Sequence, residues 1–194
     1  HMPAHIYIRT GQYARSIALN QRAAKVDEAY LARSANEGMY RMGYYPHNVD
    51  FISFSSYMEG RSALGIETAL KLAYKGALIL DANPAYGQYF SVEPMLAFVR
   101  FGKWEDILSL PQPDSKHTYV HVIWRFSRGI AFTRSGQLVL AKNEFTKLDS
   151  LSKEESLTNF YFSFNPASNI AQVPLHLLQG EILLKQGDIE GGLK

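Results

Sequence analysis

The sequence predicts an all-α protein, a right-handed solenoid of about five antiparallel helix pairs that together form a single domain. The main observation is a recurring pattern in which a glycine is followed by a helix rich in small residues, as in GQYARSIALNQRAA from Gly11 onward. The pattern recurs at Gly60, Gly102, Gly136 and Gly187. Glycine allows the backbone to end one helix and turn into the next, and the residues after Gly11 share a helical face at three- and four-residue steps.

Small residues at two fixed distances from these glycines support the same fold. Helices that cross closely need small side chains at the crossing. The residues seven before and five after each glycine are Ala4, Ser53, Met95, Gly129 and Gly180, and Ser16, Gly65, Ile107, Ala141 and Gly192. Eight of these ten residues are small, and both exceptions belong to the third repeat. We therefore expect the third repeat to be the degenerate one.

The elements follow from this register. A first helix should end near residue 10, and a second should run from residue 12 to about 27 and continue less regularly through residues 28–43. Residues 81–84 should form a turn, and Ser152 and Glu155 have the spacing of a capping box, which favours a short extra helix in the insertion 151–168. No sheet is expected. The remaining helix pairs are predicted at 46–57 with 62–79, 91–101 with 103–110, 119–134 with 138–148, and 171–186 with the residues after Gly187.

Composition narrows the class of protein. The chain has 194 residues, a net charge of +2 and 20 Lys and Arg that form no basic run, so we expect no nucleic-acid partner. It has no apolar run of membrane length, so no membrane association is expected. The absence of cysteine excludes disulfides and thiolate metal sites and favours the cytoplasm. Because the chain stops within the fifth repeat, we expect it to be a fragment of a longer solenoid.

Several motifs resemble a family of bacterial tetratricopeptide-repeat proteins along nearly the whole chain. They are HMPAHIYIRTGQY at 1–13, YYPHN at 44–48, MEGRSA at 58–63, RFGKWEDIL at 100–108 and RGIAF at 128–132. The 34 residues between Gly102 and Gly136 equal the period of that repeat. The resemblance implies an α-solenoid without a settled activity. It also implies that His1 and Met2, which a cloning scar could equally leave, are native.

One candidate site follows from the register of the repeat. In similar proteins, defined positions of the first helix of each repeat line the concave face. Counting back from the glycines places His1, His5, His47 and Asp50 on neighbouring concave positions. His1 and His5 are four residues apart and His47 and Asp50 three apart, so each pair shares a helical face. Imidazole nitrogens and a carboxylate suit zinc or a similar divalent metal ion.

A second candidate site is the concave groove itself. The same register places Arg9, Phe54, Tyr57, Arg100 and Arg134 on the concave face. Guanidinium groups bind carboxylates through two parallel hydrogen bonds, so the arginines could hold the acidic groups of a protein or peptide ligand. An interaction scaffold is therefore one hypothesis, and a metal-binding protein or metal-dependent enzyme is the other.

No sequence motif decides whether the protein is an enzyme. The chain contains no G-x-S-x-G, phosphate-binding-loop, G-x-G-x-x-G or H-E-x-x-H pattern. His117 and His121 are interpreted as capping or surface residues, and His176 as a packing residue. Tyr40, Tyr44, Tyr45 and Tyr57 and the two tryptophans are expected to fill the seams between repeats, although the tyrosines could form a ligand platform. Catalytic residues and oligomeric state stay undetermined by these patterns.

Overall fold

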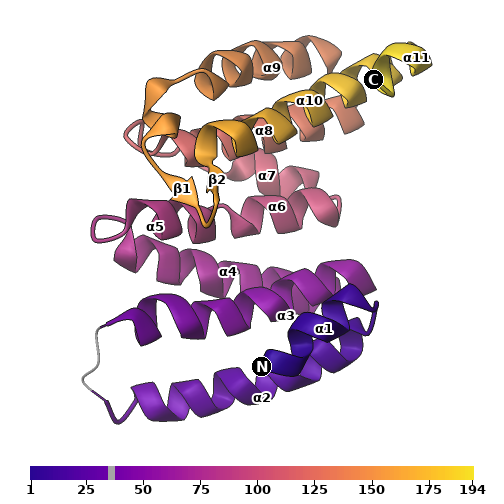
Figure 1. The fold of residues 1–194 in the computed structure, drawn as a ribbon. Helices are drawn as coiled ribbons and strands as arrows, with labels where there is room; N and C mark the ends of the chain where they lie inside the picture. Colours follow the sequence, from indigo (N-terminus) through magenta and orange to yellow (C-terminus); the bar gives the residue numbers. More distant parts are fainter. Residues whose placement is uncertain (35–37) are drawn as a thin grey trace.

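The computed structural model of the protein describes residues 1–34 and 38–194, and 77% of it is helical. Helices stack broadly along the chain, from α1 and α2 at one end to α9, α10 and α11 at the other (Figure 1). The helices are α1 Met2–Arg9, α2 Tyr13–Leu31, α3 Tyr45–Glu59, α4 Ser62–Ile79, α5 Pro84–Ser91, α6 Glu93–Arg100, α7 Trp104–Ser109, α8 Thr118–Arg134, α9 Leu138–Ser152, α10 Ala167–Lys185 and α11 Ile189–Gly192. A π-helical turn, Tyr40–Tyr44, precedes α3. The prediction of an all-helical array of packed helix pairs is confirmed.

The five predicted turn glycines each separate two helices. Gly11, Gly60, Gly102, Gly136 and Gly187 all have positive φ, between 67° and 90°. This left-handed conformation is easily reached only by glycine, because it has no Cβ. The helices therefore end where the sequence pattern predicts that they end.

Small residues do lie at close helix crossings. The Ser53 hydroxyl of α3 donates a 3.4 Å hydrogen bond to the carbonyl of Gly65 in α4. A Cβ on Gly180 of α10 would come within 2.9 Å of the Gly192 carbonyl oxygen in α11. Gly129 of α8 differs, because its nearest neighbour is Leu178 of α10, in the next helix pair. The crossing at Gly129 therefore joins two repeats.

The third repeat departs from the predicted one. Residues 84–91, which the predicted helix pairs did not include, form α5, and the turn expected at 81–84 is found at residues 80–82, directly before this helix. The Asn83 side chain accepts a 3.3 Å hydrogen bond from the Tyr86 backbone N–H, and Pro84 occupies the first helical turn, where its missing donor costs nothing. The helix expected over 91–101 starts at Glu93, after a break at Val92, because Pro94 cannot donate a helical hydrogen bond.

The insertion between α9 and α10 contains a small sheet, so the expectation of no sheet is wrong. Strands β1, Tyr161–Phe162, and β2, Asn165–Pro166, pair in antiparallel fashion. Phe162 is buried, with its ring 4.6 Å from that of Tyr119, so packing holds the hairpin in place. The extra helix is a 3₁₀ turn, Glu155–Thr158. The capping box does not form, because the Ser152 hydroxyl donates to the Asp149 carbonyl instead.

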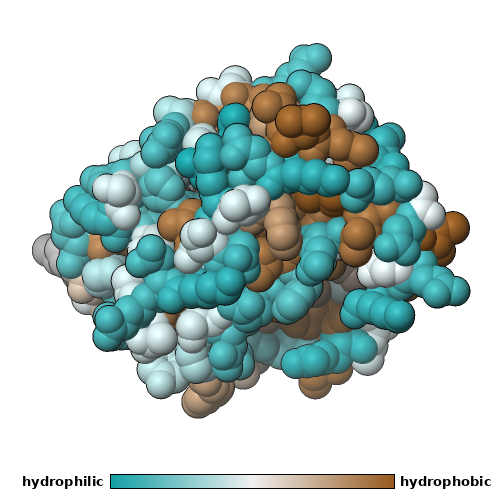
Figure 2. All heavy atoms as spheres, turned by 90° about the horizontal axis from the view of Figure 1, so that it is seen from above, coloured by the Kyte–Doolittle hydropathy of each residue, from teal (hydrophilic) through white to brown (hydrophobic). Residues whose placement is uncertain are grey.

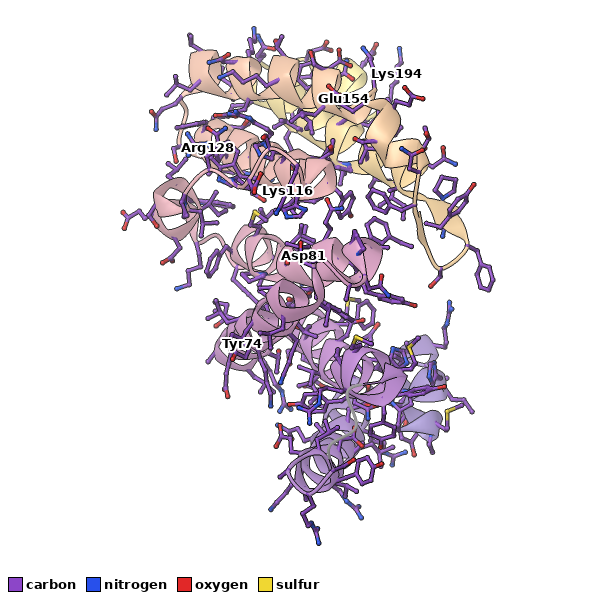
Figure 3. The ribbon with its side chains drawn as sticks, turned by 90° about the vertical axis from the view of Figure 1, so that its left-hand side faces the viewer. Tyr74, Asp81, Lys116, Arg128, Glu154 and Lys194 are labelled. Atoms are coloured by element: carbon purple, nitrogen blue, oxygen red, sulfur yellow. The ribbon has the colours of Figure 1, made fainter. Side chains whose placement is uncertain are left out.

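Two groups of buried apolar side chains form the core. One lies among α2, α3 and α4, and the other among α6, α8, α9 and α10, with Tyr89 of α5 packed against both. Side chains fill the spaces between successive helices from Tyr74 through Lys116 to Lys194 (Figure 3). The face formed by the C-terminal helices carries apolar side chains among polar ones (Figure 2). Val139 of α9 and Leu193 are among the exposed apolar residues of this end of the chain. None of the helices in the described ranges combines the length and apolar character needed to cross a membrane.

The crossing at Gly129 gives the first prediction. Replacing Gly129 with Leu should lower the free energy of unfolding by about 1 to 3 kcal/mol or more, because the new side chain would overlap the fully buried Leu178. The gain in helix propensity opposes this by only about 1 kcal/mol. Urea unfolding measures the change. Adding Leu178→Ala should restore part of the loss, and an unchanged midpoint in the single variant would contradict the close packing.

Candidate functional site

Three of the predicted metal-ligating residues meet in space. His1 and His5 project from one face of α1, and His47 projects toward them from the first turn of α3. One ring nitrogen from each lies within 4.8 Å of the others. The ring centroids of His1 and His47 are 4.7 Å apart, although 46 positions separate these residues in the chain. We call these three residues the histidine cluster.

Hydrogen bonds orient the first of these rings. The Asn20 Nδ2 group donates to the Ser16 carbonyl at 2.9 Å, which directs Asn20 Oδ1 toward His1. Because this oxygen can only accept, the 2.7 Å hydrogen bond places a proton on His1 Nδ1. The lone pair of His1 is then on Nε2, which lies 2.9 Å from His5 Nε2. With its lone pair on Nε2, His1 accepts a hydrogen bond from His5 Nε2. A polar partner that fixes one ring nitrogen and leaves the lone pair on the other is typical of metal-binding histidines.

Burial favours the neutral form of the third ring. The pKa of His47 is lowered, first by loss of contact with water and second by the proximity of His5. Phe51 contributes to this apolar setting, since its ring centroid lies 4.6 to 4.9 Å from those of all three histidines. A neutral imidazole is the form that can ligate a metal ion.

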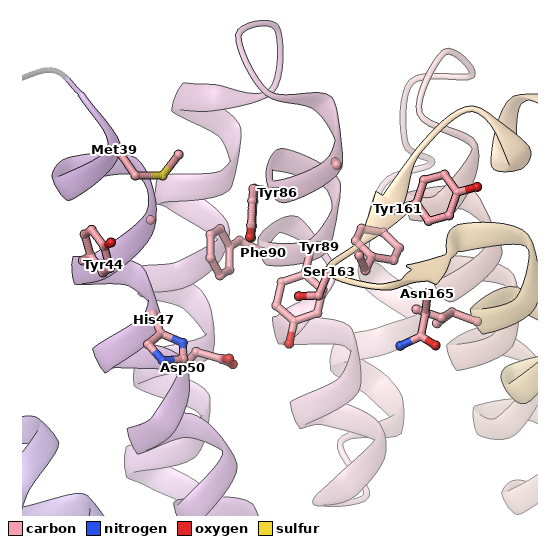
Figure 4. Close-up of a pocket in the computed structure, with 14 residues that line it drawn as sticks. Met39, Tyr44, His47, Asp50, Tyr86, Tyr89, Phe90, Tyr161, Ser163 and Asn165 are labelled. Atoms are coloured by element: carbon pink, nitrogen blue, oxygen red, sulfur yellow. The ribbon is translucent and has the colours of Figure 1, made fainter. Parts of the chain in front are cut away.

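Asp50 lies outside the histidine cluster. Its carboxyl points toward the Tyr89 hydroxyl of α5 (Figure 4), and it is not among the side chains that meet within 4.8 Å. The three-residue spacing correctly places His47 and Asp50 on nearby parts of α3. The packing of α5 beside α3 determines which way the Asp50 side chain turns.

A cavity of about 710 Å³ lies beside His47 and Asp50. Its walls come from the π-helical turn, α3, α5 and the β1–β2 hairpin (Figure 4). We call it the aromatic cavity. Its lining residues are Met39, Gly43, Tyr44, His47, Asp50, Ala85, Tyr86, Tyr89, Phe90, Tyr161, Phe162, Ser163, Asn165 and Ile170.

A second cavity, of about 410 Å³, shares Asp50 and Tyr89 with the first. We call it the acid-pair cavity, because Asp50 and Glu93 both line it. Its lining residues are Ile8, Asp50, Phe51, Phe54, Tyr57, Tyr89, Glu93, Leu96 and Arg100. Three of the predicted groove residues, Phe54, Tyr57 and Arg100, are thus found together on the faces of α3 and α6.

The other two predicted groove residues do not line this cavity. Arg9 ends α1 and is exposed. The Arg134 Nη2 group pairs with the Glu181 carboxylate of α10 at 2.6 Å. Arg125 and Arg128, which also lie on α8, contact the buried Glu144 at 2.8 and 3.1 Å. These arginines of α8 therefore bind carboxylates of the chain itself.

Glu93 is a site residue that the sequence pattern did not indicate. It begins α6, only 6% of it is exposed, and its Oε2 atom accepts a 3.1 Å hydrogen bond from the Tyr57 hydroxyl. Burial, followed by the charge of Asp50, raises the pKa of Glu93 to about 8. Burial likewise raises the pKa of Asp50 to about 6, although a hydrogen bond from Tyr89 opposes this rise. The one available signal was an acidic residue within an otherwise apolar helical stretch.

The tyrosines around the two acids are also perturbed. Burial is the main cause that raises the pKa of Tyr57, Tyr89 and Tyr119, and the charge of Glu93 adds to it in each case. These phenols therefore stay protonated near neutral pH and can donate hydrogen bonds to the carboxylates.

The other histidines lie apart from the cluster. His121 is buried and its Nε2 atom bonds the Pro113 carbonyl at 2.8 Å, so its interpretation as a surface residue is wrong. His117 occupies the N-cap position of α8 without a side-chain capping bond. His176 is exposed, which corrects its interpretation as a packing residue.

The tyrosines and tryptophans expected at seams have mixed environments. Tyr45 and Trp124 are buried, as expected. Tyr57 is largely buried against Phe101, with its ring 5.9 Å away. Tyr44 is exposed and lines the aromatic cavity instead.

No family model, curated protein or solved structure matches the chain.

The raised pKa values predict how stability depends on pH. Between the usual value of 4.5 and about 8, the folded Glu93 binds its proton more tightly than the unfolded residue. The native state then holds more protons, so the free energy of unfolding should fall as pH rises through this window. Replacing Glu93 with Gln should reduce the fall by at least about 1.4 kcal/mol, which corresponds to one pKa unit.

Urea unfolding at a series of pH values between about 5 and 8 tests this linkage. Glu105→Gln removes an exposed carboxylate and should leave the pH dependence of the wild type unchanged. An identical pH dependence for wild type and Glu93→Gln would contradict the raised pKa of Glu93.

Proposed function

We propose that the protein binds a divalent transition-metal ion, zinc or a similar ion, through His1, His5 and His47. The observation that carries this proposal is that one ring nitrogen of each histidine lies within 4.8 Å of the others. Three imidazoles are a common ligand set for zinc, and they leave a fourth position for water or substrate. The aromatic cavity, which His47 also lines, adjoins the cluster and would be the space available to such a substrate.

Only modest movement is needed to form such a site. With zinc–nitrogen distances of about 2.0 to 2.1 Å, two ligand atoms at a tetrahedral centre are about 3.3 Å apart. His1 Nε2 and His5 Nε2, now 2.9 Å apart, would separate slightly. Because the ligand nitrogens all lie within 4.8 Å of one another, any other pair would need to come closer by at most about 1.5 Å. Side-chain rotation supplies shifts of this size. The hydrogen bond to Asn20 would then serve as the outer contact that fixes the His1 tautomer.

A bound ion would supply a Lewis acid and an activated water to a substrate in the aromatic cavity. Among the chain's own residues, the phenols of Tyr86 and Tyr89 and the carboxyl of Asp50 are placed to orient that substrate. Activity measurements on the metal-loaded protein distinguish a metal-dependent enzyme from a metal-binding protein.

A tetratricopeptide-like scaffold is the second candidate. We interpret the five glycine-separated helix pairs as tetratricopeptide-like repeats of a right-handed solenoid with α1, α3, α6, α8 and α10 on its concave face. The observation that favours ligand binding there is that Phe54, Tyr57 and Arg100 line one cavity with Asp50. A protein or peptide ligand in this groove is compatible with the metal site. The absence of cysteine favours a cytoplasmic location for either activity.

Metal titration tests the first candidate. The full chain should bind one Zn²⁺ or Co²⁺ ion per molecule. Calorimetry measures the binding of either ion, and visible absorption reports the binding of Co²⁺. His5→Ala and His47→Ala should each weaken binding by at least about tenfold, because each removes one of three ligands. His176→Ala is the matched control, since it removes an exposed histidine outside the cluster. Affinity should also fall as pH falls through the histidine range, because protons compete with the ion.

Two outcomes would exclude the metal site. One is that the wild type acquires no stoichiometric metal. The other is that His176→Ala weakens binding as much as His47→Ala does. Helical circular dichroism of each variant distinguishes loss of the site from loss of the fold.

A further inference from the structure

The acid-pair cavity contains negative charge for which the described part of the chain provides no counter-ion. The chain stabilises its other buried acids: Glu144 contacts two arginines, and Asp27 accepts hydrogen bonds from Tyr40 and Asn48 at 2.7 and 2.6 Å. Within residues 1–34 and 38–194, neither Asp50 nor Glu93 forms an ion pair with a lysine, arginine or histidine. Glu93 is buried and Asp50 is half-buried, and removing uncompensated carboxylates from water is costly.

The arginine that lines the cavity is hydrogen-bonded to the backbone and not to the acids. Arg100 lines the same cavity, but its Nε group donates to the Tyr57 backbone carbonyl at 3.1 Å and the residue is exposed. Glu93 begins α6 and Arg100 ends it, so their Cα atoms are about 10 Å apart by the helical rise. Arg100 therefore lies at the mouth of the cavity, and the acids lie inside it.

One carboxylate oxygen of the acid pair lacks a hydrogen-bond donor. Among the hydrogen bonds of the described residues, Glu93 takes part through Oε2 alone, with Tyr57 as donor. Its Oε1 atom has no such partner. The raised pKa values of Asp50 and Glu93 agree with this geometry. Without a neighbouring cation, the pair reduces its negative charge by binding a proton.

The walls of the cavity are suited to an organic cation. Aromatic rings of Phe51, Phe54, Tyr57 and Tyr89 line it beside the two acids. Ring faces attract ammonium groups electrostatically, and the attraction is stronger when water is excluded. A metal ion fits less well, because in the described residues no third histidine or acid joins Asp50 and Glu93 within ligating distance.

We propose that the acid-pair cavity binds the primary ammonium group of a small organic amine between Asp50 and Glu93. The three N–H groups of a primary ammonium match three acceptors, the carboxylates of Asp50 and Glu93 and a tyrosine hydroxyl. The apolar part of the amine lies against Phe51 and Phe54. This site is distinct from the histidine cluster, from which the ring of Phe51 separates it.

The test uses a series of straight-chain alkylammonium ions from methyl to octyl, with the alcohols of the same length as neutral probes. Calorimetry on the full chain should show that at least one alkylammonium ion binds tenfold or more tightly than its alcohol. Glu93→Gln and Asp50→Asn should each weaken that binding at least tenfold while leaving alcohol binding unchanged. Glu105→Gln, which removes an exposed carboxylate on α7, is the matched control and should bind as the wild type does.

Three results would overturn the proposal: no alkylammonium ion binds, alcohols bind as tightly as the ions, or both acid variants bind the ions undiminished. Two variants are used because each removes a different member of the pair, and neither introduces a larger side chain. Metal titration of the same variants separates this proposal from the metal site. Glu93→Gln should keep the wild-type metal affinity, so either proposal can fail while the other stands.

Discussion

The close approach of α2 and α4 to the two sides of α3 is the constraint on which the rest of the structure depends. On one side the Ser55 hydroxyl donates to the Ser16 hydroxyl of α2 at 2.9 Å, and on the other Ser53 reaches the Gly65 carbonyl of α4. Larger side chains at these positions would push the helices apart. Because the helices are close, most residues of α3 are buried, and several of its polar side chains bond to other helices. Both candidate sites draw on α3, which contributes His47 to one and Asp50 to the other.

The position of Phe51 on α3 relates the two sites to each other. Its ring contacts all three histidines, and it also lines the acid-pair cavity. His47 and Asp50 both precede it by less than two helical turns, and both line the aromatic cavity. One and a half turns of helix thus contribute to a cluster of imidazoles, a pair of acids and the cavity beside them. The apolar ring of Phe51 lies between the histidine cluster and the acid-pair cavity.

The buried acids show that this part of the molecule is not arranged for stability alone. Glu144 illustrates how the same chain stabilises a buried carboxylate, with two guanidinium groups and adjacent aromatic contacts from Trp124. At Asp50 and Glu93 only phenols are present, and both pKa values rise. Strongly perturbed ionisable groups in a cavity are found more often at functional sites than elsewhere. The energetic cost of this pair is the physical reason to look for a ligand there.

The sequence by itself determined the features that depend on local backbone geometry. Glycine alone easily adopts positive φ, so the five helix ends could be located, and a four-residue spacing was enough to put His1 and His5 on one face. The register of the repeat also predicted that His47, on α3, would lie beside these two histidines. Only the tertiary structure decided what depends on long-range packing: the turn of Asp50 toward Tyr89, the recruitment of Glu93 by Tyr57, and the pairing of the α8 arginines with Glu144. Those contacts join residues between 16 and 39 positions apart, and no local spacing encodes which side chains will share a buried space.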